Sequence, residues 1–121
     1  MSTQKTLVIG ASENTERYSN KAVRMLRKYH FDVVAIGNKV GKIEDVSFGI
    51  EKIPFENIHT VTLYIGEKHQ PAYYDYVLSL NPTRIIFNPG TENDVFIEMA
   101  KAQNIECLEA CTLVMLSTGQ F

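Results

Sequence analysis

Short apolar runs alternate along the chain with segments in which apolar residues recur at helical spacing. Compact runs, typical of strands buried on both faces, occur at 6–9, 31–36, 60–65, 84–87 and 105–108. Helical spacing, with charged residues on the opposite face, follows at 19–29, 73–80 and 91–103, and a short closing helix is expected at 112–116. Glycine or Asn-Pro ends most of these segments. The pattern predicts five strands and four helices.

This alternation also predicts how the elements are arranged. Strands that alternate with helices along a chain are typical of a parallel sheet with helices on both faces. We therefore expect an α/β fold, namely a Rossmann-like three-layer α/β/α arrangement around a mainly parallel five-stranded sheet. Ligands of such folds bind beyond the carboxyl ends of the strands, where the strand order reverses. The candidate site should lie in the segments that follow each strand.

Some local features are less regular. Residues 38–58 are interrupted by Gly41, Gly49 and Pro54, although 46–48 could add a short strand. Ser19 or Asn20 is expected to cap the first helix.

The third helix has its own end signals. Thr91 and Asp94 are spaced like a capping box at its start, and Asn104 is expected just past its end.

Composition agrees with an ordinary globular protein. The chain has 121 residues, of which 45% are hydrophobic and 21% charged, so we expect a single domain over 1–121. No run of 18 apolar residues occurs, and the first apolar run is too short for a signal peptide. With two cysteines and no export signal, the sequence predicts a cytoplasmic protein with reduced thiols and no membrane contact.

Charge is divided unevenly along the chain. The net charge is −2, but residues 1–42 hold 8 of the 12 basic and 3 of the 14 acidic residues. The first third is thus positive and the remainder strongly negative. A chain that is acidic overall is a poor general nucleic-acid binder, whereas a local basic excess suits a small polyanion.

The loops after the first two strands indicate which kind of polyanion the protein would bind. Gly10 permits a tight turn before a helix, and backbone N–H groups in such a turn bind anions. A dinucleotide fingerprint would need glycines where Ser12 and Thr15 stand. After the second strand, Lys39 occupies a region where a site for NAD would carry a carboxylate. A lysine there suits a ribose phosphate, so CoA and NADP are the candidate ligands.

Several segments together resemble a known family. They are the strand and loop 8–12 with Arg17 and Ser19, the helix 20–28, the turn 88–93 and the segment 109–112. These resemble the small stand-alone proteins of the CoA-binding domain family, relatives of the N-terminal CoA-binding domain of the succinyl-CoA synthetase alpha subunit. The resemblance covers nearly the whole chain and implies that the protein binds CoA or an acyl-CoA.

The resemblance also implies roles for individual residues. The CoA pyrophosphate would be held by Gly10, Ala11, Ser12, Arg17 and Ser19. The adenosine 3′-phosphate would be bordered by Gly37, Asn38 and Lys39. Tyr64 and Ile65 would lie against the adenine or pantetheine, and the wall would be completed by Asn88, Pro89 and Gly90. The phosphorylated histidine of the synthetase domain has no counterpart here, so its catalysis is not implied.

No reaction is indicated by the remaining chemistry. The three histidines have no metal-ligand spacing, and Cys107 and Cys111 form a single C-x3-C pair, so no metal site is expected. Glu109 is a lone carboxylate at a strand end, and no catalytic motif occurs. Tyr73, Tyr74 and Tyr76 are interpreted as the packed and half-exposed faces of one helix and not as a stacking platform.

Three functions therefore remain open. The first is a binding module for a nucleotide cofactor, CoA or an acyl-CoA, without catalytic residues. The second is an NADP-binding module of the oxidoreductase type, which would need a substrate domain that this chain is too short to supply. The third is a regulatory or scaffolding domain whose cleft binds nothing tightly.

Overall fold

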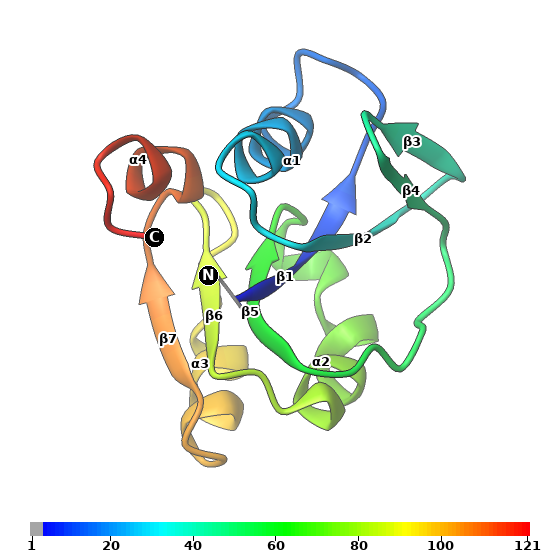
Figure 1. Cartoon of the computed structure of the whole chain (residues 1–121). Helices are drawn as coiled ribbons and strands as arrows, with labels where there is room; N and C mark the ends of the chain where they lie inside the picture. Colours follow the sequence, from blue (N-terminus) through cyan, green and yellow to red (C-terminus); the bar gives the residue numbers. More distant parts are fainter. Residues whose placement is uncertain (1–3) are drawn as a thin grey trace.

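Five parallel strands form the central sheet of the computed structural model, which describes residues 4–121 (Figure 1). The strands are β1 (Lys5–Ala11), β2 (Val33–Gly37), β5 (Ile58–Leu63), β6 (Arg84–Phe87) and β7 (Glu106–Glu109). Their order in the sheet is β2-β1-β5-β6-β7, and every neighbouring pair is parallel. The predicted α/β fold with a parallel five-stranded sheet is confirmed.

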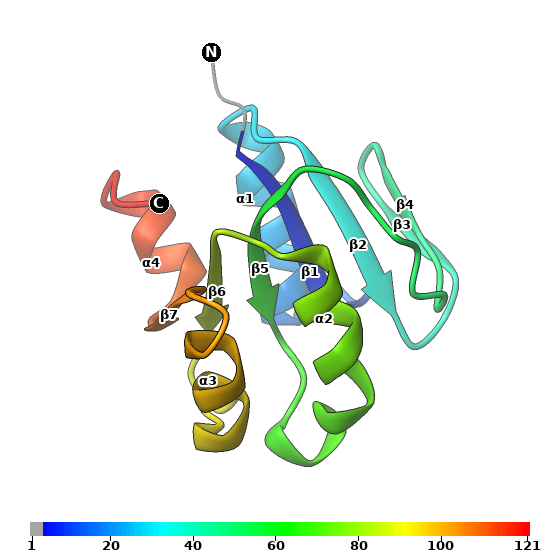
Figure 2. The same ribbon diagram turned by 90° about the horizontal axis from the view of Figure 1, so that it is seen from below.

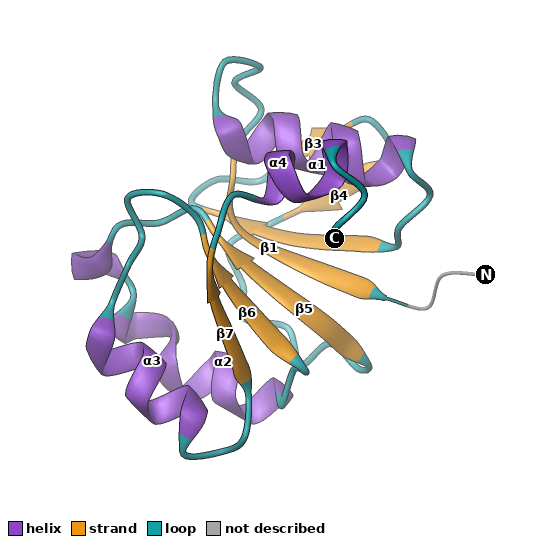
Figure 3. Cartoon of the chain, turned by 90° about the vertical axis from the view of Figure 1, so that its left-hand side faces the viewer, coloured by secondary structure: helices purple, strands orange, loops and turns teal. Residues whose placement is uncertain are grey.

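Helices cover both faces of this sheet. On one face lie α1 (Tyr18–Lys28) and α4 (Thr112–Ser117), and on the other lie α2 (Tyr74–Leu80) and α3 (Asp94–Lys101) (Figure 3). Because side chains alternate along a strand, Leu7 and Ile9 pack on the side of α2 and α3, whereas Val8 packs with Val23 and Leu26 of α1. Burial on both faces explains why the strands appear as unbroken apolar runs.

A hairpin lies beside the β2 edge of the sheet, within residues 38–58, where the sequence predicts no long regular element (Figure 2). It consists of β3 (Gly41–Ile43) and β4 (Val46–Phe48) in antiparallel register. The Gly37 N–H donates to the Gly49 carbonyl at 2.9 Å, which joins the end of β4 to β2. The extra strand at 46–48 is confirmed, and its partner strand was not predicted.

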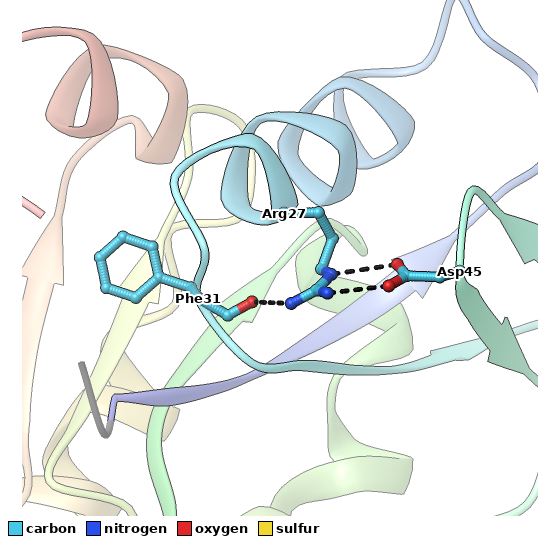
Figure 4. A network of polar contacts seen from close by, with 3 residues as sticks. All are labelled: Arg27, Phe31 and Asp45. Carbon is cyan, nitrogen blue, oxygen red and sulfur yellow. Dashed lines mark hydrogen bonds and ion pairs between the residues drawn. The ribbon is translucent and has the colours of Figure 1, made fainter. Parts of the chain in front are cut away.

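An ion pair fixes this hairpin against α1. The Arg27 guanidinium bonds both carboxylate oxygens of Asp45, at 3.0 and 2.8 Å, and donates a third bond to the Phe31 carbonyl at 2.7 Å (Figure 4). These hydrogen bonds hold the pKa of Asp45 below its ordinary value. The hairpin is therefore tied to the helix that follows the first loop.

Two predicted helix starts are wrong in detail. Helix α1 begins at Tyr18, so Ser19 and Asn20 lie inside its first turn instead of capping it. Asn93, not Thr91, caps α3, because its side-chain oxygen accepts from the Phe96 N–H at 3.1 Å.

The predicted helix ends are closer to the structure. Asn81, the cap residue directly after the last residue of α2, adopts a left-handed conformation with φ 49°. Asn104, past the end of α3, is also left-handed, with φ 62°. Asparagine tolerates this conformation better than most residues, which is why an asparagine follows the C-terminal end of each of these two helices.

Two further features bear on how the chain meets its surroundings. Strand β7 borders the sheet, and Glu106 and Glu109 at its two ends are exposed. Among the helices of residues 4–121, none is both long and apolar enough to cross a lipid bilayer.

Candidate functional site

A cleft lies where the strand order reverses, at the carboxyl ends of β1 and β5. Strand β2 lies on one side of β1 within the sheet, and β5 lies on the other side of β1. The loops that leave these strands diverge, and the space between them has a volume of about 520 Å³. Its lining comprises Gly10, Ala11, Ser12, Arg17, Tyr18, Ser19, Gly37, Asn38, Tyr64, Ile65, Gly66, His69, Tyr73, Pro89, Gly90 and Thr91.

Glycine at position 10 is required by two features of the structure. Its φ is +102°, a region that residues with a Cβ rarely adopt. A Cβ at this position would also lie 2.9 Å from the Tyr64 carbonyl oxygen. The end of β1 therefore approaches the segment after β5 more closely than any larger residue would allow.

The first loop is held in place from behind. Buried Asn20 donates from Nδ2 to the Ser12 carbonyl at 2.9 Å. Arg24 donates from Nε to the Asn20 side-chain oxygen at 2.7 Å and from Nη2 to the Thr15 carbonyl at 3.2 Å. Within the loop, the Ser12 hydroxyl accepts from the Asn14 N–H at 3.1 Å. Asn20 and Arg24, which fix the loop from behind, do not line the cleft.

The start of α1 is suited to an anion. Arg17 occupies the N-cap position without a side-chain cap, and the first turn contains no acidic residue. The first N–H groups of a helix lack intrahelical acceptors, and its dipole places positive charge at this end. Arg17 itself is exposed, and within residues 4–121 its guanidinium forms no hydrogen bond or ion pair. Helix α3, in contrast, is capped by Asn93 and begins with Asp94.

A buried amide network supports the opposite wall. Gln70, which is fully buried, donates from Nε2 to the Ile65 carbonyl at 3.0 Å and the Thr91 carbonyl at 2.8 Å. Its side-chain oxygen accepts from Asn93 Nδ2 at 2.9 Å, and the same nitrogen donates to the Tyr74 hydroxyl at 2.9 Å. One glutamine therefore joins the loop after β5 to the loop after β6.

Most residues predicted for the site come together in the cleft. They are Gly10, Ala11, Ser12, Arg17, Ser19, Gly37, Asn38, Tyr64, Ile65, Pro89 and Gly90. Lys39 lies instead in an adjoining hollow of about 320 Å³, which shares Ala11, Ser12, Arg17 and Asn38 with the cleft. The two spaces are thus continuous along the first loop.

Asn88 does not lie on the cleft wall, contrary to the prediction. Its side chain is buried and donates to the Thr62 hydroxyl at 2.6 Å and the Leu63 carbonyl at 2.8 Å. Its oxygen accepts from the Thr112 N–H at 2.9 Å. Every one of these bonds goes to a neighbouring strand or to α4, so Asn88 acts beneath the cleft as a structural connection.

Five lining residues were not predicted, and they are Tyr18, Gly66, His69, Tyr73 and Thr91. Two short 3-10 turns, η1 (Glu67–His69) and η2 (Pro71–Tyr73), separate β5 from α2 and place His69 and Tyr73 beside the cleft. The sequence analysis placed Tyr73 on a packed or half-exposed face of the helix, whereas the structure has it in the 3-10 turn directly before α2. Tyr18 could have been found from its position next to Arg17.

Among the residues that line the cleft, Tyr64 has a strongly shifted pKa. Burial raises the pKa of Tyr64 to about 12, an effect that the nearby Thr112 and Thr62 hydroxyls oppose. The Tyr64 hydroxyl nevertheless forms no hydrogen bond of standard geometry within residues 4–121. It stays protonated at neutral pH, so the ring contributes no charge to the site.

The cysteines and possible metal ligands lie elsewhere. Cys107 and Cys111 are free thiols, each half-buried, and neither lines the cleft. Burial raises the pKa of Cys107. Within residues 4–121, no group of three or more His, Cys, Asp or Glu side chains is arranged to hold a metal ion.

Comparison with known proteins identifies the family. The sequence profile of the family described as CoA binding domain matches residues 4–117, and the chain belongs to this family. Membership supports a CoA-binding role in general and confirms the resemblance seen in the sequence. No relative is found among curated proteins.

Solved structures share the fold. A crystal structure of an uncharacterized protein is 40% identical, each chain covers 100% of the other, and the TM-score is 0.96. A Thermus thermophilus protein, titled cell-free ID.343, is 17% identical, with 98% of this chain and 90% of that chain covered and a TM-score of 0.81. A hypothetical protein from Pyrococcus horikoshii is 20% identical, with coverages of 95% and 82% and a TM-score of 0.80. At such identities, the last two show the fold alone.

Proposed function

We propose that the protein binds CoA or an acyl-CoA in the cleft at the carboxyl ends of β1 and β5. The observation that carries this proposal is the joint position of an uncapped helix N-terminus and an unpaired arginine, Arg17, at one wall of that cleft. Together they form a site for a diphosphate, and the family of the chain makes CoA the diphosphate-containing ligand to consider first.

The parts of CoA can be assigned to the parts of the site. The pyrophosphate would lie against the first loop and Arg17, where N–H groups and a guanidinium supply donors. The adenosine 3′-phosphate would lie in the adjoining hollow near Lys39. The pantetheine would then run over Tyr64 and Ile65 toward Gly90, along the less polar part of the cleft.

The proposal concerns binding and not a reaction. The cleft is lined by one imidazole, that of His69, and by no carboxylate or thiol. General acid–base or covalent catalysis needs a nucleophile or proton-transfer pair within hydrogen-bond reach. The lining residues support recognition of phosphates more directly than they support any bond-breaking step.

Isothermal titration calorimetry with CoA, acetyl-CoA, dephospho-CoA, NADP and NAD tests this assignment. We expect CoA to bind most tightly, dephospho-CoA more weakly because it lacks the 3′-phosphate, and NAD least. Absence of CoA binding would contradict the proposal and favour the scaffolding alternative. Tighter binding of NADP than of CoA would favour the oxidoreductase alternative.

Variants locate the binding in this cleft. Arg17→Ala should weaken CoA binding by about 10- to 100-fold, since a charge-assisted hydrogen bond contributes roughly 1.5–3 kcal/mol. Arg17→Lys should be intermediate, because lysine keeps the charge and loses the planar fork. Lys28→Ala is the matched control, as Lys28 is an exposed cation at the far end of the same helix. Lys39→Ala should weaken binding of CoA and leave that of dephospho-CoA unchanged.

A further inference from the structure

One carboxylate lies in the hollow that adjoins the cleft, among the groups that would attract phosphate. Glu13 lines this hollow together with Arg17 and Lys39, whereas no carboxylate lines the cleft itself. A carboxylate repels phosphate oxygens, so a ligand group that contacts Glu13 would have to be something other than a phosphate.

The Glu13 side chain is fixed in position although it is exposed. Its Oε2 accepts a hydrogen bond from the Lys42 backbone N–H at 2.9 Å, which joins the first loop to β3. Gly41 leaves room for this approach, because a Cβ there would lie 2.8 Å from Glu13 Cγ and 2.9 Å from Cδ. Within residues 4–121, Oε1 forms no hydrogen bond. One carboxylate oxygen is therefore committed to the fold, and the other is available to a ligand.

The rest of the hollow suits a flat, partly apolar group. Ala11, Val40 and Phe48 contribute to its lining, and Val40 is 79% exposed. An exposed apolar side chain beside a hollow gains from contact with an apolar ring face. With a volume of about 320 Å³, the hollow has room for a purine base.

We propose that Glu13 accepts a hydrogen bond from the exocyclic amino group of the adenine and so selects a 6-aminopurine over a 6-oxopurine. The inference rests on the proposed function, because it concerns the base of the same ligand. Adenine presents an N–H donor at this position, whereas hypoxanthine and guanine present an oxygen whose lone pairs repel a carboxylate. Two groups of the hollow would then bind different parts of the ligand: Glu13 would contact the base, and Lys39 would bind the ribose phosphate.

The test compares CoA with an analogue that carries hypoxanthine in place of adenine, by isothermal titration calorimetry. Wild-type protein should bind CoA at least about tenfold more tightly than the analogue, the effect of one charge-assisted hydrogen bond. Glu13→Ala should bring the ratio of the two affinities close to one. Glu13→Gln should abolish or invert the preference, because its amide nitrogen faces the base when its oxygen stays on the Lys42 N–H. Glu16→Gln, in the same loop and outside both spaces, is the matched control.

The outcomes separate this inference from the proposed function. A purely structural role of Glu13 would weaken binding of both ligands equally and leave their ratio unchanged, which would overturn the inference. Equal affinities for the two ligands in the wild-type protein would overturn it as well, while CoA binding itself stood. Absence of CoA binding would overturn both proposals. Thermal unfolding of each variant establishes that the compared proteins are folded.

Discussion

Replacing Gln70 with leucine should lower the free energy of unfolding more than any exposed polar substitution. Leucine has nearly the same volume, so the change removes hydrogen bonds without opening a large cavity. Three bonds are lost, two to the carbonyls of Ile65 and Thr91 and one from Asn93. At about 1 kcal/mol each, and with buried partners left unsatisfied, we expect a loss of about 3 kcal/mol. That is a large share of the roughly 5–15 kcal/mol by which domains are stable.

Equilibrium denaturation in urea measures this loss as a lower midpoint at an unchanged slope. The midpoint of thermal unfolding should fall by roughly 12 °C. Gln103→Leu is the matched control, because Gln103 is exposed and its side chain donates a single hydrogen bond, to the Leu78 carbonyl at 3.3 Å. Its effect should stay within about 0.5 kcal/mol. If Gln70→Leu costs no more than this control, the amide network does not support the cleft wall as we reason.

Three further substitutions test other parts of the structure by the same denaturation measurements. Gly10→Ala should cost about 1–3 kcal/mol more than Gly90→Ala, because both residues have positive φ but only Gly10 has neighbours within contact distance of a new Cβ; equal costs would contradict this. Asn93→Ala should cost about 2 kcal/mol through loss of the cap of α3 and of its amide bonds, and a neutral effect would argue against the capping role. The Arg27 bonds lower the pKa of Asp45, so their stabilisation is present above the ordinary carboxyl pKa of about 3.9 and is lost as the pH falls through the lowered value. Asp45→Asn should therefore make thermal stability less dependent on pH below about pH 4, and an unchanged pH profile would refute this reasoning.

The strands could be predicted because their signal is local. Each is short, apolar and buried on both faces, so a few adjacent residues suffice to identify it. The strand Gly41–Ile43 has no such pattern, and it depends on distant groups, namely the Arg27–Asp45 ion pair and the Glu13 carboxylate. Tertiary contacts of this kind leave no periodic trace in the sequence.

The candidate site was predictable to a similar extent and for a similar reason. Gly10 lies near the end of β1 and Arg17 lies in the loop that follows it, and the fold class alone brings strand ends together. His69 and Tyr73 reach the cleft through 3-10 turns whose course depends on the buried Gln70. Asn88 follows a strand too, but an amide can face a ligand or a neighbouring backbone, and only the packing decides between them.

The two borders of the sheet are protected against intermolecular pairing by different means. Next to β2, the segment at Gly49 occupies part of the strand's outer edge. Strand β7 is open, yet an antiparallel encounter of two copies centred between Cys107 and Leu108 would set Glu106 of each against Glu109 of the other. Like charges placed directly opposite disfavour such a ladder. The acidic ends of this strand thus oppose aggregation by sheet extension, at little expense to the core that the strand completes.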